Sequence, residues 1–262
     1  MTVDRVAAFA RERAAVLSFC GELSEAQWRT DSAAPGWRVQ DVVAHMGASC
    51  KALFTPAAIT LFTTRNIERA NDRPVETRRD WSSQRVLAEY DRWSAWTHRA
   101  AKVVAGTPAR GLPTRLGELG SFKMGLVLPG ALVFDHHVHL RHDIAPALGV
   151  AAPPTDAERM IVVVEWMMAV LENQLKAAPP SWLSGPVALD LDGGGGGRWR
   201  IHPDGAVTVD DVTRHDAVGA VRGDVQAFPS WATTRSGWRS TDLELTGDVE
   251  QVTRVLDSIN IV

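Results

Sequence analysis

The strongest constraint on the fold of this chain is a change in its hydrophobic pattern near residue 178. Up to residue 176, apolar residues recur at spacings of three and four, which is the period of helices with one buried face. After the stretch LKAAPPSWLSGP, which is rich in Pro, Gly and Ser, several segments alternate apolar and polar residues, as half-buried strands do. We therefore expect an α+β protein of two domains, a helical bundle over residues 1–178 and a small α+β domain over residues 185–262.

The individual elements follow from the same two patterns. In the bundle, helices are expected over residues 3–20, 36–54, 80–106, 130–145 and 156–176, and a capping box at residues 24–27 opens a short turn. In the second domain, strands are expected over residues 186–192, 197–202, 205–211 and 241–248, with helix candidates over residues 224–234 and 248–258. Five successive glycines, Gly193–Gly197, lie between two strands with no helix after them, so we interpret them as a hairpin loop rather than a phosphate-binding loop.

Composition and charge limit the partners of the chain. With 28 Lys and Arg against 31 Asp and Glu, the net charge of −3 gives no electrostatic footprint for nucleic acid or an anionic membrane. The N-terminal segment carries charges throughout and lacks the apolar core of a signal peptide, and the longest charge-free apolar stretch, residues 124–134, is too short to span a bilayer. We expect a soluble, cytoplasmic protein that binds neither nucleic acid nor a membrane, and whose partner is a small molecule or another protein.

The two cysteines, Cys20 and Cys50, both lie in helical apolar patterns. Their spacing gives neither a disulfide framework nor a CxxC metal site. Because free cysteine is commonly buried, both are predicted to be core residues.

The segment VFDHHVHLRHDI, residues 133–144, places four of the eight histidines of the chain within seven positions, between apolar residues. In a helix, Asp135 and His139 are four residues apart and project from one face, and His142 follows one turn later. A carboxylate and an imidazole at this spacing can bind one divalent metal ion. A third ligand has to come from another helix, and His45 is the candidate because it lies mid-helix among apolar residues.

Each part of this interpretation has an alternative. Taken alone, His45 could be a core histidine with satisfied hydrogen bonds, and residues 135–142 could form a polar face at a domain interface. Taken together they favour a metal site, because three unpaired polar groups inside a bundle would each cost about 1–3 kcal/mol. Asp41 could hold the second ring nitrogen of His45, or could be an acid favoured in the first turn of a helix. His136 and His137 point to other faces and are expected behind the ligands or at the surface.

Three parts of the chain carry a resemblance to a known family. They are GWRVQDVVAHM at residues 36–46, FDHHVHLRHDIAPALG at residues 134–149, and the C-terminal segment TTRSGWRSTDLELTGDVEQVTRVLDSI at residues 233–259. In these pieces and in their order, the chain resembles the mycothiol-dependent maleylpyruvate isomerase family over nearly its whole length. The resemblance implies a DinB-like metal-binding four-helix bundle followed by a domain similar to sterol carrier proteins.

The resemblance also implies the metal ligands, which are His45, Asp135 and His139. Two departures from the family pattern concern these residues. Type members have Glu in place of Asp135, which shortens the reach of the carboxylate by one methylene. The second motif usually runs His-x-x-Asp, whereas three residues separate His139 from Asp143 here, which leaves His142 as an alternative ligand.

A further implication of the resemblance is an arginine of the second domain that assists the active site. Arg235 is the best match to the Gly-Arg or Thr-x-Arg turn of the family, and Arg239 is the second. Either could instead be an exposed arginine in a loop.

The expected chemistry follows from the ligand set. A metal held by two histidines and a carboxylate keeps an open coordination position, as catalytic zinc does. Binding to such a metal converts a thiol, whose pKa is about 8.5, into a thiolate. Because neither Cys20 nor Cys50 lies in the motifs, the thiol is expected to be a cosubstrate, and the resemblance implies mycothiol.

We therefore expect an enzyme that depends on zinc or another divalent metal and uses mycothiol. It would be a thiol transferase, or an isomerase like that for maleylpyruvate, in which a metal-bound thiolate adds to an electrophilic small molecule. In the isomerase, addition to a cis double bond, rotation and elimination give the trans isomer. The alternative is a noncatalytic small-molecule-binding or stress-response protein that retains the scaffold.

Overall fold

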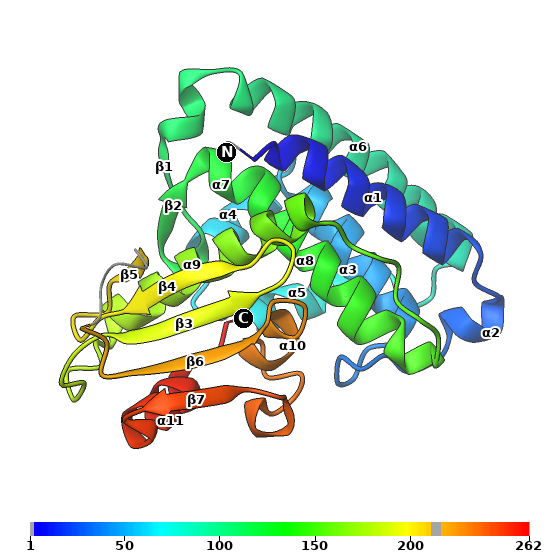
Figure 1. Ribbon diagram of the computed structural model, residues 1–262. Helices are drawn as coiled ribbons and strands as arrows, with labels where there is room; N and C mark the ends of the chain where they lie inside the picture. Colours follow the sequence, from blue (N-terminus) through cyan, green and yellow to red (C-terminus); the bar gives the residue numbers. More distant parts are fainter. Residues whose placement is uncertain (1–2, 211–215, 262) are drawn as a thin grey trace. The chain divides into compact units, whose positions relative to one another are not determined.

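The computed structural model describes residues 3–210 and 216–261, which divide into two compact units, Met1–Thr155 and Asp156–Val262 (Figure 1). The first unit is mainly helical and the second is built on a sheet, so the expected α+β organisation is confirmed at this level. Residues 1, 2 and 262, at the ends of the expected domain ranges, lie outside the described residues, as does residue 211 at the end of the strand expected over 205–211.

The helical unit begins with α1 (Arg5–Gly21), α2 (Glu25–Trp28) and α3 (Val39–Ala52). It continues with α4 (Ala57–Thr63), α5 (Ile67–Glu76), α6 (Ser83–Ala105), η1 (Pro108–Gly111) and a small hairpin of β1 (Pro113–Arg115) and β2 (Ser121–Lys123) around η2 (Gly117–Leu119). The last part is one continuous helical stretch, formed by α7 (Met124–Leu126), η3 (Val127–Ala131), α8 (Leu132–Val138) and η4 (His139–Ile144), followed by η5 (Pro146–Leu148). The helices expected over residues 3–20, 36–54, 80–106 and 130–145 are therefore confirmed, as is the capping box between Ser24 and Gln27.

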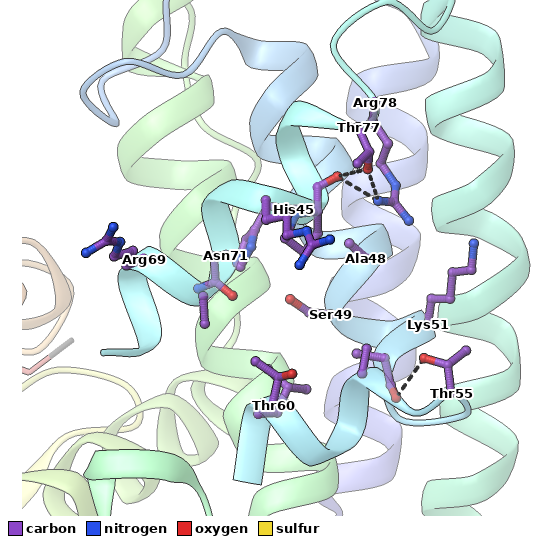
Figure 2. Close-up of a pocket in the computed structure, with 16 residues that line it drawn as sticks. His45, Ala48, Ser49, Lys51, Thr55, Thr60, Arg69, Asn71, Thr77 and Arg78 are labelled. Atoms are coloured by element: carbon purple, nitrogen blue, oxygen red, sulfur yellow. Dashed lines mark hydrogen bonds between the residues drawn. The ribbon is translucent and has the colours of Figure 1, made fainter. Parts of the chain in front are cut away.

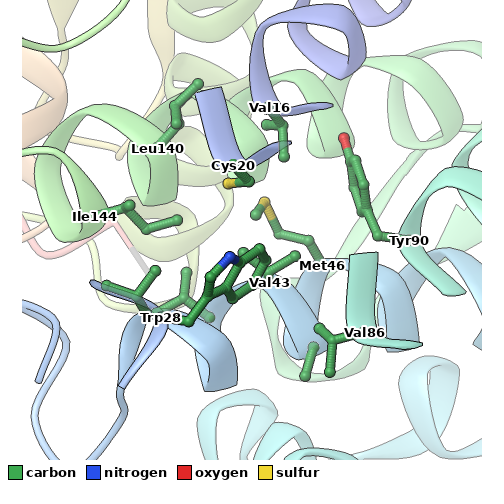
Figure 3. Close-up of a cluster of buried hydrophobic side chains, with 12 residues drawn as sticks. Val16, Cys20, Trp28, Val43, Met46, Val86, Tyr90, Leu140 and Ile144 are labelled. Atoms are coloured by element: carbon green, nitrogen blue, oxygen red, sulfur yellow. The ribbon is translucent and has the colours of Figure 1, made fainter. Parts of the chain in front are cut away.

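Four helical segments of this unit pack around one apolar core. Contacts join α1 to α6, α6 to α3, α3 to η4 and α8 back to α1, and these helices run side by side in Figure 1. Their buried apolar faces meet in a cluster from α1, α2, α3, α6 and η4 (Figure 3). The labelled members of this cluster are Val16, Cys20, Trp28, Val43, Met46, Val86, Tyr90, Leu140 and Ile144. Removal of this apolar surface from water is what stabilises the four-helix arrangement.

Gly47 sets how closely α3 and α6 approach each other. A Cβ atom at Gly47 would lie 3.2 Å from Cα of Tyr90 and 3.3 Å from its backbone nitrogen. Only a glycine lets the two helices pack at this distance without a shift. His45 lies two residues before Gly47 on the same helix, so the place where α3 packs against α6 is next to His45.

The sheet unit contains α9 (Ala157–Ala177), β3 (Val187–Asp192), β4 (Gly197–Ile201), β5 (Val207–Val209), β6 (Gly219–Asp224), α10 (Phe228–Ala232), η6 (Trp238–Ser240), β7 (Glu244–Gly247) and α11 (Val249–Ser258). The strands form a mixed sheet in the order β5-β4-β3-β6-β7, in which β3 and β6 are parallel and the other neighbours are antiparallel. Alternate residues of β3, beginning with Val187, are buried, as period-2 alternation requires. Gly193–Gly197 connects the antiparallel strands β3 and β4, which confirms the hairpin interpretation.

Helix α9 is grouped differently from the sequence expectation, which placed residues 156–176 with the bundle. Contacts assign α9 to the sheet unit, where it touches β5 and α10. Two glycines of the sheet unit explain its close packing. A Cβ at Gly195 would lie 2.6 Å from the Ala157 carbonyl oxygen, and one at Gly205 would lie 2.4 Å from the Leu175 carbonyl oxygen. The run of apolar residues in α9 is buried, as core residues are.

Both cysteines are buried, Cys20 at 1% and Cys50 at 0% exposure, which confirms that they are core residues. Among the described residues, no single helix is long and apolar enough to cross a membrane. Helices α3 and α4 taken together have the length and the apolar composition of a membrane span, but the angle between them is 98°.

Candidate metal centre

The start of α3 positions His45, and Asp41 determines how this helix begins. The Asp41 carboxylate accepts hydrogen bonds from the backbone nitrogen of Arg38 at 3.0 Å and from its Nε at 3.1 Å. Asp41 is 1% exposed and thus closes the N-terminus of α3 together with Arg38. Of the two interpretations of Asp41, the structure therefore supports the acid in the first helical turn. His45 follows one turn later on the same helix, 4% exposed.

Three side chains from two helices meet beside Trp37. His45 Nε2 lies 3.1 Å from Asp135 Oδ1, and His139 Nε2 lies 3.5 Å from the same oxygen. The rings of His45 and His139 are 5.0 Å apart between centroids and nearly perpendicular, at 76°. Among the described residues, His45, Asp135 and His139 are the His, Cys, Asp or Glu side chains close enough to share one metal ion, with ligand atoms within 4.8 Å of one another.

The donor set and the distances fit a metal ion of the zinc type. Imidazole nitrogen and carboxylate oxygen are typical zinc ligands at about 2.0–2.2 Å, so neighbouring ligand atoms of a tetrahedral site lie roughly 3.3 Å apart. The separations of 3.1 and 3.5 Å bracket this value. The shorter aspartate in place of a glutamate therefore still reaches both histidines. Since these separations also suit a hydrogen-bonded ion pair, a proton on a histidine can take the place of the metal.

Asp143 fixes the orientation of His139 through a widened helical turn. The segment η4 is a π-helix, in which the Ala145 backbone nitrogen donates to the Leu140 carbonyl oxygen five residues earlier, at 3.1 Å. Within this segment Asp143, four residues after His139, lies with its Oδ2 2.7 Å from His139 Nδ1. An Nδ1–H donated to Asp143 leaves Nε2 of His139 facing Asp135, which is the tautomer that a metal ligand needs.

His136 lies directly behind Asp135. Its Nδ1 is 3.4 Å from Asp135 Oδ2, the oxygen that faces away from His45 and His139. The ring is 0% exposed and packs between the rings of Phe9 and Tyr90, each 5.4 Å away between centroids. The sequence suggested only that His136 points to another face. His136 thus lies against one carboxylate oxygen of Asp135 while the other faces the two histidines.

Electrostatics in this group favour a carboxylate and a protonated imidazole when no metal is bound. Burial opposes ionisation of Asp135, but the charges of His45 and His139 outweigh it and hold the pKa of Asp135 well below its usual range. Burial likewise disfavours the charged form of His139, yet Asp135 and the hydrogen bond to Asp143 raise the pKa of His139 to about 9. Such displaced pKa values are common at functional sites.

The remaining histidines of the segment, buried His137 and half-buried His142, lie in a separate cluster. The ring of His137 is 6.0 Å from that of His142, and its Nδ1 is 3.4 Å from Glu12 Oε1 on α1. Glu12 is 0% exposed and also accepts a hydrogen bond of 2.8 Å from Arg141. His142, the alternative ligand, is thus placed beside His137 and is not one of the three clustered side chains.

The two candidate arginines both belong to the sheet unit. Arg235 is exposed in the turn after α10 and follows Thr234, whose φ of 58° is unusual for a β-branched residue. Arg239 is committed elsewhere, because its guanidinium donates to both carboxylate oxygens of Asp257, at 2.7 and 2.9 Å, and lies over the ring of Trp238. Arg239 is thus held by Asp257 within the sheet unit.

Trp37 is a site residue that the sequence analysis missed. Its ring lies 5.1 Å from that of His45 and 6.4 Å from that of His139, between centroids. It packs beside both histidines from the loop before α3. The available signal was its place in the motif GWRVQDVVAHM, eight residues before His45.

The fold and this group of side chains define an α+β protein whose helical unit carries a His, Asp and His set suited to a divalent metal. The sequence profile described as "Mycothiol maleylpyruvate isomerase N-terminal domain" matches residues 9–145, more than half of the 262 residues. The chain belongs to this family of mycothiol maleylpyruvate isomerases.

Two solved structures have a similar fold. One is the crystal structure of the mycothiol-dependent maleylpyruvate isomerase in a mutant form, with 13% sequence identity and a TM-score of 0.57 over 92% of this chain and 91% of that chain. The other is the crystal structure of the mycothiol-dependent maleylpyruvate isomerase, with 12% identity and a TM-score of 0.55 over the same shares of the two chains. At these identities the likeness concerns the fold. Comparison with curated proteins gives no match.

Proposed function

We propose that this protein is a mycothiol-dependent enzyme, an isomerase like that for maleylpyruvate or an S-transferase, that works with zinc or another divalent metal. In this proposal the helical unit is a DinB-like bundle that holds the metal, and the sheet unit is a domain similar to sterol carrier proteins. The observation that carries it is the meeting of His45, Asp135 and His139 at one buried point in a member of this family.

The side chains of the protein would divide the work as follows. His45, Asp135 and His139 would hold the metal, which when bound supplies a Lewis acid that keeps a thiol in its thiolate form. Asp143 keeps Nε2 of His139 directed at the site, and Trp37 packs beside both histidines. The sulfur of the thiolate would add to an electrophilic carbon of the small-molecule substrate.

The thiol has to come from outside the protein. Burial raises the pKa of Cys20 to about 12, and it also raises that of Cys50 to about 12, where the hydrogen bond to Thr97 opposes the shift only in part. Thiols with such pKa values hold almost no thiolate near neutral pH and react poorly. Mycothiol, named by the family, fits this requirement as the cosubstrate.

Arg235 is proposed to pair with a carboxylate of a substrate, since a guanidinium can bind a carboxylate in bidentate fashion. Replacement by alanine would then raise KM for acidic substrates more than it lowers kcat. Arg239→Ala is the matched control in the same turn region, because Arg239 already pairs with Asp257.

The metal proposal is tested by elemental analysis of purified wild type and of His45→Ala and His139→Ala. Wild type should hold about one divalent metal per chain, and both variants should lose most of it, because two remaining ligands bind weakly. His98→Ala, on α6 and outside the site, is the matched control and should keep the metal. Full occupancy in both site variants would refute the ligand assignment.

The enzymatic proposal is tested by incubating metal-loaded protein with mycothiol and either maleylpyruvate or a panel of epoxides, quinones and activated alkenes. Isomerisation and thiol adducts are both followed by mass spectrometry. Consumption of thiol above background, lost in His45→Ala, is expected. No consumption with any acceptor, and no thiol-induced spectral change in cobalt-substituted protein, would favour the noncatalytic binding or stress-response alternative.

A further inference from the structure

A cavity of about 480 Å³ lies in the helical unit between α3, α4 and α5, with His45 in its wall (Figure 2). Its size is within the range of sites for small organic molecules. His45 is also the residue whose Nε2 lies 3.1 Å from Asp135 Oδ1. The cavity and the candidate metal centre therefore share His45.

The walls of this cavity are basic. Four cationic side chains line it, and among the described side chains no Asp or Glu does. These cations are Lys51, Arg69, Arg73 and Arg78. A cavity lined by charges of one sign attracts a ligand of the opposite sign.

Two of the four cations share one protein carboxylate, that of Glu89. Lys51 Nζ donates to Glu89 Oε1 at 3.0 Å, and Arg78 binds both oxygens of the same carboxylate. Arg78 also donates to the Pro74 carbonyl oxygen at 2.6 Å, so its donors connect α5 to α6. Through Glu89, these two residues connect α3 and α5 to α6 at the wall of the cavity.

Arg69 and Arg73 differ from this pair. Both line the cavity and are exposed, and within the described part of the chain neither guanidinium has an ion pair or hydrogen-bond partner. They are four residues apart on α5, so they lie on one helical face and repel each other. An arrangement that is unfavourable in the free helix becomes favourable when an anion binds between the two groups.

The rest of the lining suits a ligand with a carbon body. Small apolar side chains, including Ala48, Ala52 and Ala70, make up much of the wall. Figure 2 shows Ser49 and Asn71 turned towards the space between the helices, and neither side chain has a hydrogen-bond partner among the described residues. Both can thus bind polar atoms of a ligand that enters past Arg69 and Arg73.

We propose that this cavity binds a small organic anion, with a carboxylate held by Arg69 and Arg73 and the other end of the molecule beside His45. These two arginines are then specificity-determining residues of the helical unit. That the bound anion is the electrophilic substrate rests on the proposed function, whereas anion binding itself does not.

The binding test uses succinate, a dicarboxylate, and its neutral analogue succinamide, with no thiol present. Isothermal titration calorimetry at low salt should show binding of succinate to wild type, about tenfold or more weaker binding to Arg69→Ala/Arg73→Ala, and none of succinamide. The Lys double variant should bind with intermediate affinity, because lysine keeps the charge but not the fork of donors. Arg92→Ala, an exposed arginine on α6 outside the cavity, is the control and should match wild type. Equal succinate binding in wild type and the alanine double variant, with both folded by circular dichroism, would refute the site.

Enzyme kinetics of wild type and the double variant distinguish the anion site from the proposed enzymatic function. If thiol transfer occurs, the double variant should raise KM for carboxylated acceptors about tenfold and leave a neutral acceptor such as N-ethylmaleimide unchanged. Succinate binding that depends on the two arginines, without any thiol transfer, would support the anion site and refute the enzymatic proposal. Thiol transfer with an unchanged KM for carboxylated acceptors would support the enzyme and refute the assignment of the bound anion as its substrate, while the succinate titration alone decides the anion site.

Discussion

The two units of this chain bury different kinds of side chain. In the helical unit Glu12, His45, His137, Arg141 and Asp143 are all less than 9% exposed, and they lie in close ionic contacts. In the described part of the sheet unit the buried charged residues are two arginines, and other charges pair at the surface.

Buried charges are costly, and close pairing rarely makes them more stabilising than apolar packing. Their concentration in the helical unit is therefore better explained by chemistry than by stability. The sheet unit, in contrast, has the composition of an ordinary folded domain. Buried charged side chains, which lower the stability of a core, therefore indicate which unit holds the functional centre.

The largest expected effect is on Glu12, whose removal leaves Arg141 and His137 buried without their carboxylate. Glu12→Gln should lower the free energy of unfolding by about 3–5 kcal/mol, measured by urea denaturation. Asp192→Asn, which removes a carboxylate from an exposed pair with Arg222 in the sheet unit, is the control and should leave the urea midpoint unchanged. An equal loss of stability in Glu12→Gln and Asp192→Asn would contradict the difference between the two units.

A smaller effect is expected at Asp143, which is 0% exposed and holds Nδ1 of His139. Asp143→Ala should weaken metal binding about 10–100-fold, as loss of a carboxylate behind a histidine ligand does. The measurement is competition against a chromophoric chelator. Asp257→Ala, which frees Arg239 in the sheet unit, is the matched control and should bind metal normally. Unchanged affinity in Asp143→Ala would show that the contact does not position the ligand.

The dependence of stability on pH should also distinguish the helical unit. In metal-free protein the pKa of His139 is raised to about 9, above the value of about 6.5 expected in the unfolded chain. Its contribution to stability is thus fully present below pH 6.5 and is lost as the pH rises through 9. Urea midpoints of chelator-treated protein should fall over this window, and those of His139→Gln should not.

Metal-loaded protein should behave in the opposite way. The proton on His139 competes with the metal, so affinity for the metal should rise as the pH increases towards 9. A metal affinity independent of pH between 6 and 9 would show that His139 carries no proton in the metal-free site.

The smallest effect is expected in the sheet unit at Thr234, the one non-glycine residue with positive φ in the described part of the chain. Thr234→Gly should raise the free energy of unfolding by up to about 1 kcal/mol, because relief of strain exceeds the entropy that glycine adds to the unfolded chain. Thr241→Gly, at an ordinary φ of −102°, should lower it instead. If Thr234→Gly is stabilising but impairs turnover of acidic substrates, the strain serves to present Arg235.

The sequence predicted most elements of both units because their apolar residues recur with a clear period. It also grouped Asp135 and His139, since a four-residue spacing on a helix places side chains on one face, and it added His45 because this residue lies mid-helix among apolar residues. Strand β6 was missed because GAVRGD, with two glycines and two charges, does not alternate as a half-buried strand does. Its place beside β3 depends on parallel pairing with a distant segment.

Other features depend on contacts that no local pattern encodes. The residues of α4 and α5, which line the cavity, show no apolar period long enough to identify them as core helices, and their exposed faces explain why. The grouping of α9 with the sheet depends on close approach at Gly195 and Gly205, far away in the sequence. The partner of Asp41 could not be chosen from spacing alone, because Arg38, three residues before it, and His45, four residues after it, are both within reach.

The π-turn at His139–Ile144 has an evolutionary consequence. A regular helix with one residue fewer between His139 and the following aspartate would direct that carboxylate towards much the same nitrogen. A one-codon insertion or deletion in this turn can therefore be absorbed without displacing the side chains before it. Proteins that differ by such a codon would keep the same contact between the histidine and the aspartate. Sequence motifs that require a fixed number of residues between the two would nevertheless place these proteins in different families.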